Sequence, residues 1–320
     1  MTSPSPLHDT SPARLSRRRR FDALGVLVAV LAIAGLWSLA QYRIATERQQ
    51  ALAAAMQANA RLAAAYERQV HRTLKAAEQV AAFVREQHRR QGARLPLADW
   101  VAQGVIREPL FNIISVVDAQ GEIVSSSSPG PGRVNYADRD FFRLQRESRG
   151  DALFVSAPVL GRVSGRWQVP MSLRITRADG SFGGVVVLSV DPGDFTAFSR
   201  DADLGRQGLL ELTGLDGVVR GRAIGEESRF GMEARRLPWF QRRLTTPQGE
   251  FVDGGEAVDG VARVVSYRSM ADYPLMVVVG TSVDEVYAAV QQRHTRYRVW
   301  AAVLSALLLV LLAWRLRRRR

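Results

Sequence analysis

The chain has 320 residues, no cysteine and a formal net charge of +13. Ten arginines in the two terminal flanks, set against Asp9 and Asp22, account for +8 of this charge, so the body of the chain is only mildly basic. Thiolate metal sites and disulfides are excluded. Clustered arginine beside an apolar stretch is explained by anionic lipid headgroups, so the charge does not predict a nucleic-acid partner.

Two apolar stretches frame the chain, and each has arginines on its outer side. Arg17–Arg20 precede the stretch Phe21–Ala40, and Arg315 and Arg317–Arg320 accompany the end of Val299–Trp314. About 20 apolar residues span a bilayer as a helix, and excess arginine marks the cytoplasmic side. The pattern predicts a two-pass membrane protein with both ends in the cytoplasm and the body outside it.

The first stretch has one alternative interpretation, a cleaved signal peptide, because a basic segment precedes it. Its apolar length is closer to that of a span, and no small-x-small cleavage site precedes Gln41. The second stretch is shorter, but Trp300 and Trp314 are placed where interfacial aromatic residues are expected. We therefore expect both stretches to span the membrane.

A long helix is predicted from Gln41 to about Arg90, because this segment is rich in alanine and lacks glycine and proline. Its apolar stripe is formed by Tyr66, Val70, Ala77, Val80 and Val84, at helical spacing. The stripe can pack on the helix's own domain or pair with a second copy of the chain. We expect both, and hence a homodimer.

Strand patterns follow the helix. A hairpin is predicted from Phe111–Val117 and Glu122–Ser126 around the turn at residues 118–121. The later elements are a loop at Pro129–Gly132, a helix at about Asp138–Gln145, and strands at Ala152–Ala157, Trp167–Thr176 and Phe182–Val190.

This order then repeats in shorter form. The second set consists of a hairpin of Leu209–Thr213 and Val218–Arg222 around Leu215–Gly217, a helix at Leu237–Leu244, strands at Gly249–Asp253, Val261–Ser269 and Leu275–Thr281, and a return helix at Val283–Tyr297. Two related modules in tandem are the simplest account. The fold class is α+β, with a long N-terminal helix and two modules with antiparallel sheets between two transmembrane helices.

The predicted domain organisation follows from these elements. It comprises a basic tail (1–20), a first span (21–41), a stalk helix with a helical connection (42–104), a membrane-distal module (105–204), a membrane-proximal module (205–285), a return helix (286–298), a second span (299–315) and a second basic tail (316–320).

Several stretches carry a family resemblance through their order and spacing: Val116–Ser125, Asn135–Phe142, Ser164–Trp167, Gly183–Asp191, and Tyr267–Arg268 followed by Tyr273–Leu275. Together they resemble the double Cache (PDC) sensor domains of bacterial histidine kinases, diguanylate cyclases and chemoreceptors, which implies that the two modules are PAS-like. The resemblance covers about residues 42–297. It implies a sensor in the bacterial inner membrane whose distal module holds a small ligand.

The resemblance also implies a binding site. Arg139 stands where the family often grips a ligand carboxylate, and a guanidinium offers a two-pronged charged donor. Asp191 matches the acid that receives the amine in amino-acid-binding relatives. The amino-acid pattern is incomplete, because Phe141 and Phe142 replace a tryptophan and a tyrosine, and Pro158 is followed by valine. A carboxylate or dicarboxylate is therefore also open. The candidate ligand-binding residues are Tyr136, Arg139, Phe141, Phe142, Arg166, Trp167, Arg174 and Asp191.

Structural alternatives exist for these residues. Arg139 can pair with its acidic neighbours, Asp191 can cap a following helix, Arg166 and Trp167 can form a cation–π pair, and Arg174 can point into the pocket or away from it.

Enzymatic and metal-binding signatures are scarce. The chain lacks H-E-x-x-H, G-x-S-x-G and P-loop motifs, and its histidines, His8, His71, His88 and His294, are scattered. We expect no enzyme, cofactor or metal site. The Gly254–Val258 segment resembles the active loop of diguanylate cyclases but is interpreted as a hairpin turn.

The leading hypothesis is a sensor that binds a small anionic ligand and transmits a population shift across the membrane to a separate kinase, cyclase or chemotaxis partner. That partner is expected because only residues 315–320 follow the second span. The alternatives are a receptor fragment without its output domain, a protein-interaction module with a filled distal pocket, and a membrane-anchored enzyme.

Overall fold

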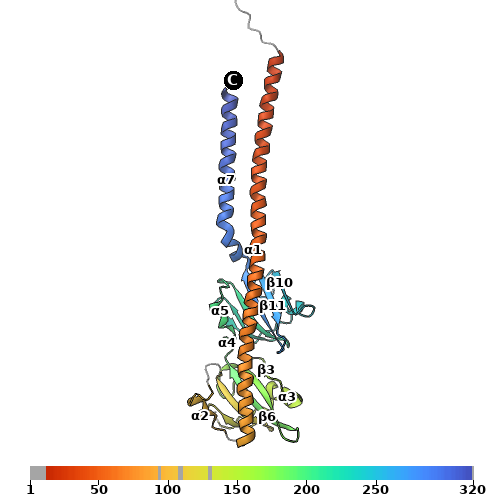
Figure 1. Ribbon diagram of the computed structural model, residues 1–320, viewed down its shortest axis with the longest axis vertical. Coiled ribbons are helices and arrows are strands. Elements are labelled where there is room, and N and C mark those ends of the chain that lie inside the picture. Colours follow the sequence, from red (N-terminus) through yellow and green to blue (C-terminus); the bar gives the residue numbers. More distant parts are fainter. Residues whose placement is uncertain (1–11, 93–94, 107–110, 129–131, 319–320) are drawn as a thin grey trace, which may run out of the picture. The chain divides into compact units, whose positions relative to one another are not determined.

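The computed structural model describes residues 12–92, 95–106, 111–128 and 132–318 (Figure 1). It divides into two compact units, a terminal unit of Met1–Ala53 with Asp284–Arg320 and a body of Ala54–Val283. The predicted α+β class is confirmed, with a long N-terminal helix and two antiparallel sheets.

The terminal unit is made from two helices, each long and apolar enough to cross a membrane. α1 (Pro12–Gln91) joins the first apolar stretch and the stalk without a break, and α7 (Val283–Arg318) joins the return helix and the second stretch. Each pair was expected as two separate elements. The merger has a simple reason, since neither glycine nor proline lies between Gln41 and Arg90 to end a helix.

Apolar side chains are exposed along both stretches, as lipid-facing positions require. Leu31 is 62% exposed and Val310 is 64% exposed. Outside the apolar segments the two helices share polar contacts: the Tyr297 hydroxyl donates to Glu47 at 2.6 Å, and Arg48 lies over the Tyr287 ring. The side chains of Arg17–Arg20 and the residues Arg319 and Arg320 lie outside the described part of the chain.

The distal module is a six-stranded antiparallel sheet. Its main path runs β2-β1-β6-β5-β3, and β4 pairs with β5. The elements are α2 (Leu97–Ala102), β1 (Ile113–Asp118), β2 (Ile123–Ser126), α3 (Asp140–Glu147), β3 (Phe154–Val155), β4 (Val159–Leu160), β5 (Trp167–Thr176) and β6 (Phe182–Val190).

Predicted strands β5 and β6 have the bounds expected from sequence, whereas other elements need correction. α3 begins two residues later than predicted, because Arg139 is still extended at the N-cap position. β3 is shorter than the predicted Ala152–Ala157, and β4 was not predicted. The predicted loop at Pro129–Gly132 falls largely on residues 129–131, which lie outside the described residues.

The proximal module is a second six-stranded sheet with the order β10-β11-β12-β7-β8-β9. Its elements, with the two short helices that precede it, are α4 (Pro192–Thr196), α5 (Phe198–Asp201), β7 (Leu209–Gly214), β8 (Val219–Ile224), β9 (Glu227–Arg229), α6 (Pro238–Arg242), β10 (Gln248–Asp253), β11 (Arg263–Ser269) and β12 (Leu275–Ser282).

The hairpins and final strands agree with the sequence, while α6 is shorter than predicted and β11 begins at Arg263 rather than Val261. α4 is the helix that the capping alternative for Asp191 required, whereas α5 and β9 were missed. Residues 254–258 lie in the loop between β10 and β11, so their interpretation as a hairpin turn is confirmed.

The two modules are structural repeats, down to single hydrogen bonds. Tyr136 N donates to Gly121 O and Ala234 N to Gly217 O, each at 2.7 Å. In both modules the opening hairpin contains a β-bulge, which lies on β2 opposite Val116/Val117 and on β8 opposite Leu212/Thr213. Ser115 pairs with Ser126 in the first hairpin, as Glu211 pairs with Arg222 in the second.

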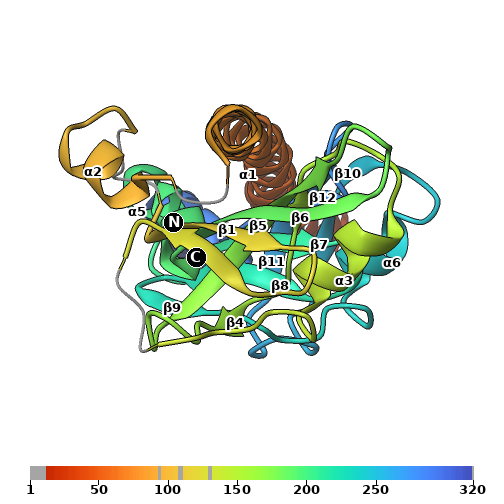
Figure 2. The same cartoon turned by 90° about the horizontal axis from the view of Figure 1, so that it is seen from below.

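The main core lies between α1 and one face of both sheets, and Figure 2 shows α1 end-on beside the strands, which run across the view. The predicted stripe is buried there: Tyr66, Ala77 and Val84 are fully buried, Val70 is 2% exposed, and Val80 is partly buried. The opposite faces carry separate apolar clusters against α3 and α6. The packing of the stripe on its own domain is therefore what the structure shows, and a dimer remains a prediction.

Gly184 provides a local test of the distal sheet. Its φ is +128°, and a Cβ there would lie 2.0 Å from the Val117 carbonyl oxygen. We expect Gly184→Ala to lower the free energy of unfolding by about 1–3 kcal/mol through backbone strain. The new Cβ would also push the Val117 carbonyl oxygen away, which should lower the free energy of unfolding further. Chemical unfolding of the detergent-solubilised chain measures this. Gly180→Ala is the control, because Gly180 also has positive φ but faces open space; equal losses for the two variants would contradict the prediction.

Candidate functional site

The start of α3 and the loop between β4 and β5 (residues 161–166, the 161–166 loop) form the candidate site in the distal module. Arg139 stands at the N-cap position of α3, and its Nη2 donates to Leu160 O at 2.9 Å. Its Nε is buried and has no hydrogen-bond partner. A buried donor without a hydrogen bond destabilises the folded protein, and a charged donor does so more strongly. A ligand acceptor that bonded to this nitrogen would remove that cost.

Arg162 ties the 161–166 loop to the segment before α3. Its guanidinium donates to Asn135 O at 2.6 Å and to both carboxylate oxygens of Asp138 at 2.7 Å. The hydrogen bonds from Arg162 lower the pKa of Asp138 to about 2. Asp140 pairs with Arg143 instead. Asp138 and Asp140 are thus occupied by other arginines, and Arg139 is not engaged by either of them in an ion pair.

The aromatic candidates lie beneath this point in an apolar cluster. Phe142 is fully buried, Phe141 is 3% exposed and Tyr136 is 6% exposed, against Val185 and Val187 of β6. Tyr136 meets Phe141 edge-on at 5.4 Å between ring centroids. Burial raises the pKa of Tyr136. These rings form a packed floor to the site.

Buried polar groups connect this floor to the sheet. The Ser172 hydroxyl donates to Phe141 O at 3.0 Å, and Gln145 Nε2 donates to Ser172 O at 2.7 Å. Arg174 donates to Gln145 O at 2.6 Å and lies over the Phe182 ring. The position of α3 is therefore fixed to β5 by hydrogen bonds at both its start and its end.

The remaining candidates lie elsewhere. Arg174 caps the C-terminal end of α3, and Asp191 caps α4 by accepting from Gly193 N at 2.8 Å. Arg166 is exposed in the 161–166 loop, and Trp167, 49% exposed, packs on Phe230 at 5.4 Å rather than under Arg166. The structure brings together Tyr136, Arg139, Phe141 and Phe142.

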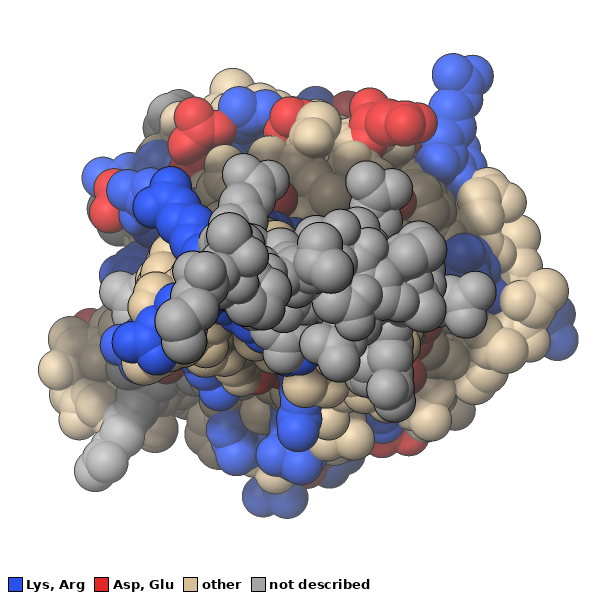
Figure 3. All heavy atoms as spheres, turned by 90° about the horizontal axis from the view of Figure 1, so that it is seen from above, with Lys and Arg blue, Asp and Glu red and all other residues tan. Residues whose placement is uncertain are grey.

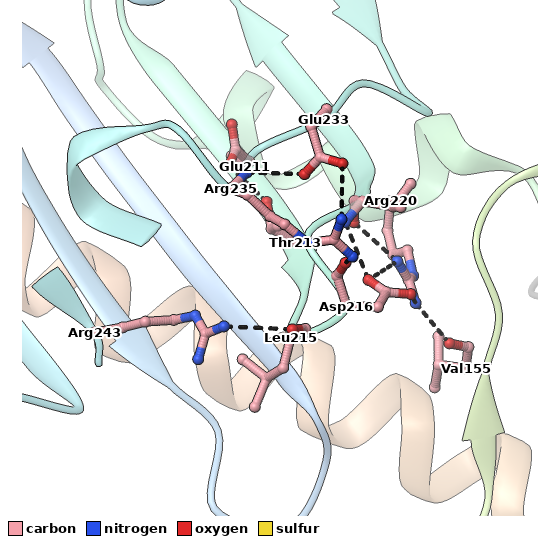
Figure 4. A network of polar contacts seen from close by, with 10 residues as sticks. Val155, Glu211, Thr213, Leu215, Asp216, Arg220, Glu233, Arg235 and Arg243 are labelled. Carbon is pink, nitrogen blue, oxygen red and sulfur yellow. Dashed lines mark hydrogen bonds and ion pairs between the residues drawn. The ribbon is translucent and has the colours of Figure 1, made fainter. Parts of the chain in front are cut away.

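Sequence reasoning missed the residues that hold the two modules together. Arg220 on β8 is 2% exposed; it forms a two-pronged ion pair with Asp216 at 2.8 Å and donates to Val155 O of β3 at 2.9 Å (Figure 4). Val155 belongs to the distal module, so one proximal side chain connects the two sheets. The available signal was two arginines two residues apart within an apolar strand, Arg220 and Arg222.

A buried ion pair also occupies the proximal module, where the distal module has serines. Glu211 is fully buried, and it accepts from Arg222 Nε at 2.5 Å, Thr213 Oγ1 at 2.5 Å and Trp239 Nε1 at 3.1 Å. The Nη2 atom of Arg222 is buried without a partner. Side chains of the module itself therefore fill this position.

Open hollows occur beyond the candidate site. One of about 1000 Å³ is lined by residues of 193–206 and of 223–228, and one of about 740 Å³ lies beside the end of α1. None of the eight predicted residues lines either of them. Figure 3 shows basic and acidic side chains intermingled on the visible face, so no single sign of charge covers it.

Comparisons with known proteins bear on the fold of the body. Residues 193–280 match a family described as histidine kinase sensor domain, dCache_1_like. The extracellular domain of rpHK1S-Z16, a protein assigned to the histidine kinases, superposes with a TM-score of 0.67 at 24% identity, covering 74% of this chain and 98% of that one. The body has the double Cache fold.

Two chemoreceptor domains share the double Cache fold at lower identity. The ligand-binding domain of Pseudomonas fluorescens CtaA, solved with L-isoleucine, gives a TM-score of 0.57 at 14% identity, covering 76% of this chain and 99% of that one. Pseudomonas aeruginosa PctB, solved with L-Gln, gives 0.52 at 13%, covering 74% and 93%. No curated protein matches the chain at a significant level. The predicted resemblance is confirmed at the level of the fold, and in the sequence the double Cache body lies between two apolar helices.

Proposed function

We propose that this protein is a two-pass inner-membrane sensor whose distal module binds a small carboxylate-bearing molecule at Arg139. The observation that carries the proposal is the buried, unpartnered Arg139 Nε beside a loop that is held by one surface ion pair and by the hydrogen bond from Arg162 to Asn135 O. A ligand carboxylate would accept from this atom and compete with Leu160 O for the guanidinium. Amino acids bound to CtaA and PctB support the choice of ligand class.

Access to the site would require the 161–166 loop to move. Asp138 and Arg162 are 65% and 38% exposed, and an exposed ion pair contributes only about 0–1 kcal/mol. The loop is therefore held weakly enough for a ligand to displace it. In this proposal the loop is a lid, and its opening and closing on the ligand are the events that the sensor reports.

Transmission would follow the elements that leave the body. Both modules pack on α1, which continues into the first apolar stretch, while α7 follows β12 directly. A ligand that favours one closure of the distal module would bias the helices by population shift and alter the contact with a separate signalling partner. The cytoplasmic location of both ends belongs to this proposal.

The test is a thermal unfolding screen of the full chain in lipid nanodiscs, followed by tryptophan fluorescence, against amino acids and dicarboxylates. Ligand at about a hundredfold excess over Kd stabilises the folded state by about 2.7 kcal/mol. We expect at least one compound to raise the unfolding midpoint of the wild type, and Arg139→Ala to abolish the increase.

Arg143→Ala is the matched control, because Arg143 lies on the same helix but is half-exposed and pairs with Asp140. It should retain the full ligand response. A response that survives Arg139→Ala would place the ligand elsewhere, and a panel without any response would argue against a small-molecule ligand.

A second function, recognition of a protein partner, is favoured by one observation. The space beneath Arg139 is filled by buried aromatic rings, while Leu160 and Trp167 of the β4–β5 hairpin are about half-exposed. If the chain is well folded and no compound of the panel raises its unfolding midpoint, this second function is favoured.

A further inference from the structure

A basic hollow of about 740 Å³ lies on the distal module beside the last turns of α1. Its walls come from the end of α1, the β1–β2 hairpin, the segment that follows α3 and the turn between β5 and β6. Four arginines line it: Arg85, Arg89, Arg149 and Arg177. This is independent of the proposed Arg139 site, which involves the start of α3 and the 161–166 loop.

The acids in the hollow already have partners. Glu86 accepts from Arg89 and Arg90, and these hydrogen bonds lower its pKa to about 2. Each carboxylate oxygen of Asp151 accepts a hydrogen bond from the Arg85 guanidinium. Asp118 accepts from the backbone N–H groups of its own turn, at Gln120 and Glu122.

Two of the arginines lie outside these ion pairs. Within the described part of the chain, neither Arg149 nor Arg177 forms an ion pair, and the Arg177 guanidinium donates to the Ser181 hydroxyl at 3.5 Å. Hydrogen bonds from Ser181 lower the pKa of Asp179, and charge attraction from Arg177 adds a smaller part. The Nδ1 atom of His88 is buried and lacks a hydrogen-bond partner. Among the described residues, the hollow therefore combines two guanidiniums that are not in ion pairs with an imidazole nitrogen that has no hydrogen-bond partner.

We propose that this hollow binds a small polyanion that carries carboxylate or phosphate groups. Arg149 and Arg177 approach from separate segments, so one ligand with at least two anionic groups can engage both. Guanidiniums match carboxylate and phosphate geometry with paired hydrogen bonds. Gly183 lies in the same wall, and a Cβ there would come within 3.2 Å of Arg177 Cγ, so the absence of a side chain leaves Arg177 its place.

The experiment measures binding of citrate and of pyrophosphate to the full chain in uncharged nanodiscs, by titration calorimetry and by the unfolding midpoint. Citrate represents carboxylate ligands and pyrophosphate represents phosphate ligands. We expect saturable binding of at least one, and a roughly tenfold or larger loss of affinity in Arg149→Ala/Arg177→Ala, since hydrogen bonds to charged groups contribute about 1.5–3 kcal/mol each.

The matched control is Arg133→Ala, which removes an exposed arginine of the same module that does not line the hollow. It should bind like the wild type. Sodium chloride at equal ionic strength should not reproduce the stabilisation. Equal affinity in the double variant and the wild type, equal stabilisation by the chloride control, or no binding of either probe would overturn the proposal. Arg139→Ala should leave this binding intact, so a failure here is distinguishable from a failure of the Arg139 site.

Discussion

Glu211→Ala is expected to lower the free energy of unfolding by about 3–5 kcal/mol, because it leaves a buried guanidinium without its carboxylate. Glu211 is fully buried and Arg222 is 6% exposed, so water cannot replace the lost partner. Trp239 Nε1 and the Thr213 hydroxyl would lose their acceptor in the same variant. Chemical unfolding of the detergent-solubilised chain, with the proximal Trp239 as an internal probe, measures the loss.

The variant that separates charge burial from packing is Glu211→Leu/Arg222→Met. Replacing both partners of a buried ion pair by apolar residues is often neutral or stabilising, whereas removing one is not. We expect the double variant to recover most of the stability that Glu211→Ala loses. A double variant as unstable as Glu211→Ala would show that the pair itself is not the source of the effect.

Arg220→Met is expected to weaken the connection between the modules, with a loss of about 2–3 kcal/mol from its charge-assisted hydrogen bonds. Its guanidinium reaches Asp216 within the proximal hairpin and Val155 O in the distal sheet. Asp216 is 45% exposed, so water can replace Arg220 as its hydrogen-bond partner. The hydrogen bond to Val155 O is therefore the more important loss. Unfolding of the variant should become less cooperative, with separate transitions for the two sheets.

Arg235→Ala is the matched control for this prediction. Arg235 also donates to the hairpin turn, at Asp216 O, but it is 62% exposed and does not reach β3. It should leave the cooperativity of unfolding unchanged. A single transition in Arg220→Met with wild-type steepness would contradict the role of Arg220 as a link between the sheets.

Acid should reproduce part of the Arg220 effect. Burial alone would raise the pKa of Asp216, but hydrogen bonds and charge attraction from Arg220 outweigh it and lower the pKa below its ordinary value of 3.8. A carboxyl whose pKa is lower in the folded state stabilises that state above pH 3.8, and the stabilisation disappears as pH falls below it. The difference in stability between wild type and Arg220→Met should therefore shrink below about pH 4.

Much of the fold was predictable because its signals are local. The turns at 118–121 and 215–217 placed both hairpins, and the apolar runs at 167–176 and 182–190 placed strands buried along most of their length. The helix stripe beginning at Tyr66 identified the face that packs on the sheets. These features depend on residues that are close in the sequence, so the spacing of apolar and turn-forming residues predicts them directly.

The candidate site was less predictable because its contacts join distant segments. Arg139 was identified, but its contact with Leu160 depends on the unpredicted strand β4. Alternation would place Arg220 and Arg222 on one face of β8, yet the bulge opposite Leu212/Thr213 separates them. Arg222 contacts Glu211, whereas Arg220 contacts the distal module. The alternation of residues along a strand cannot predict this difference.

The repeat has a consequence for how each module responds to substitution. At one matching position, the distal module has Ser115 opposite Ser126, and the proximal module has Glu211 opposite Arg222. The Glu211–Arg222 ion pair fills this position in the proximal module, and Trp239 of α6 donates a hydrogen bond to Glu211. A substitution at this position therefore costs the proximal module a buried ion pair, whereas it costs the distal module one hydroxyl contact. We expect the distal wall to accept changes of side chain that would unfold the proximal module.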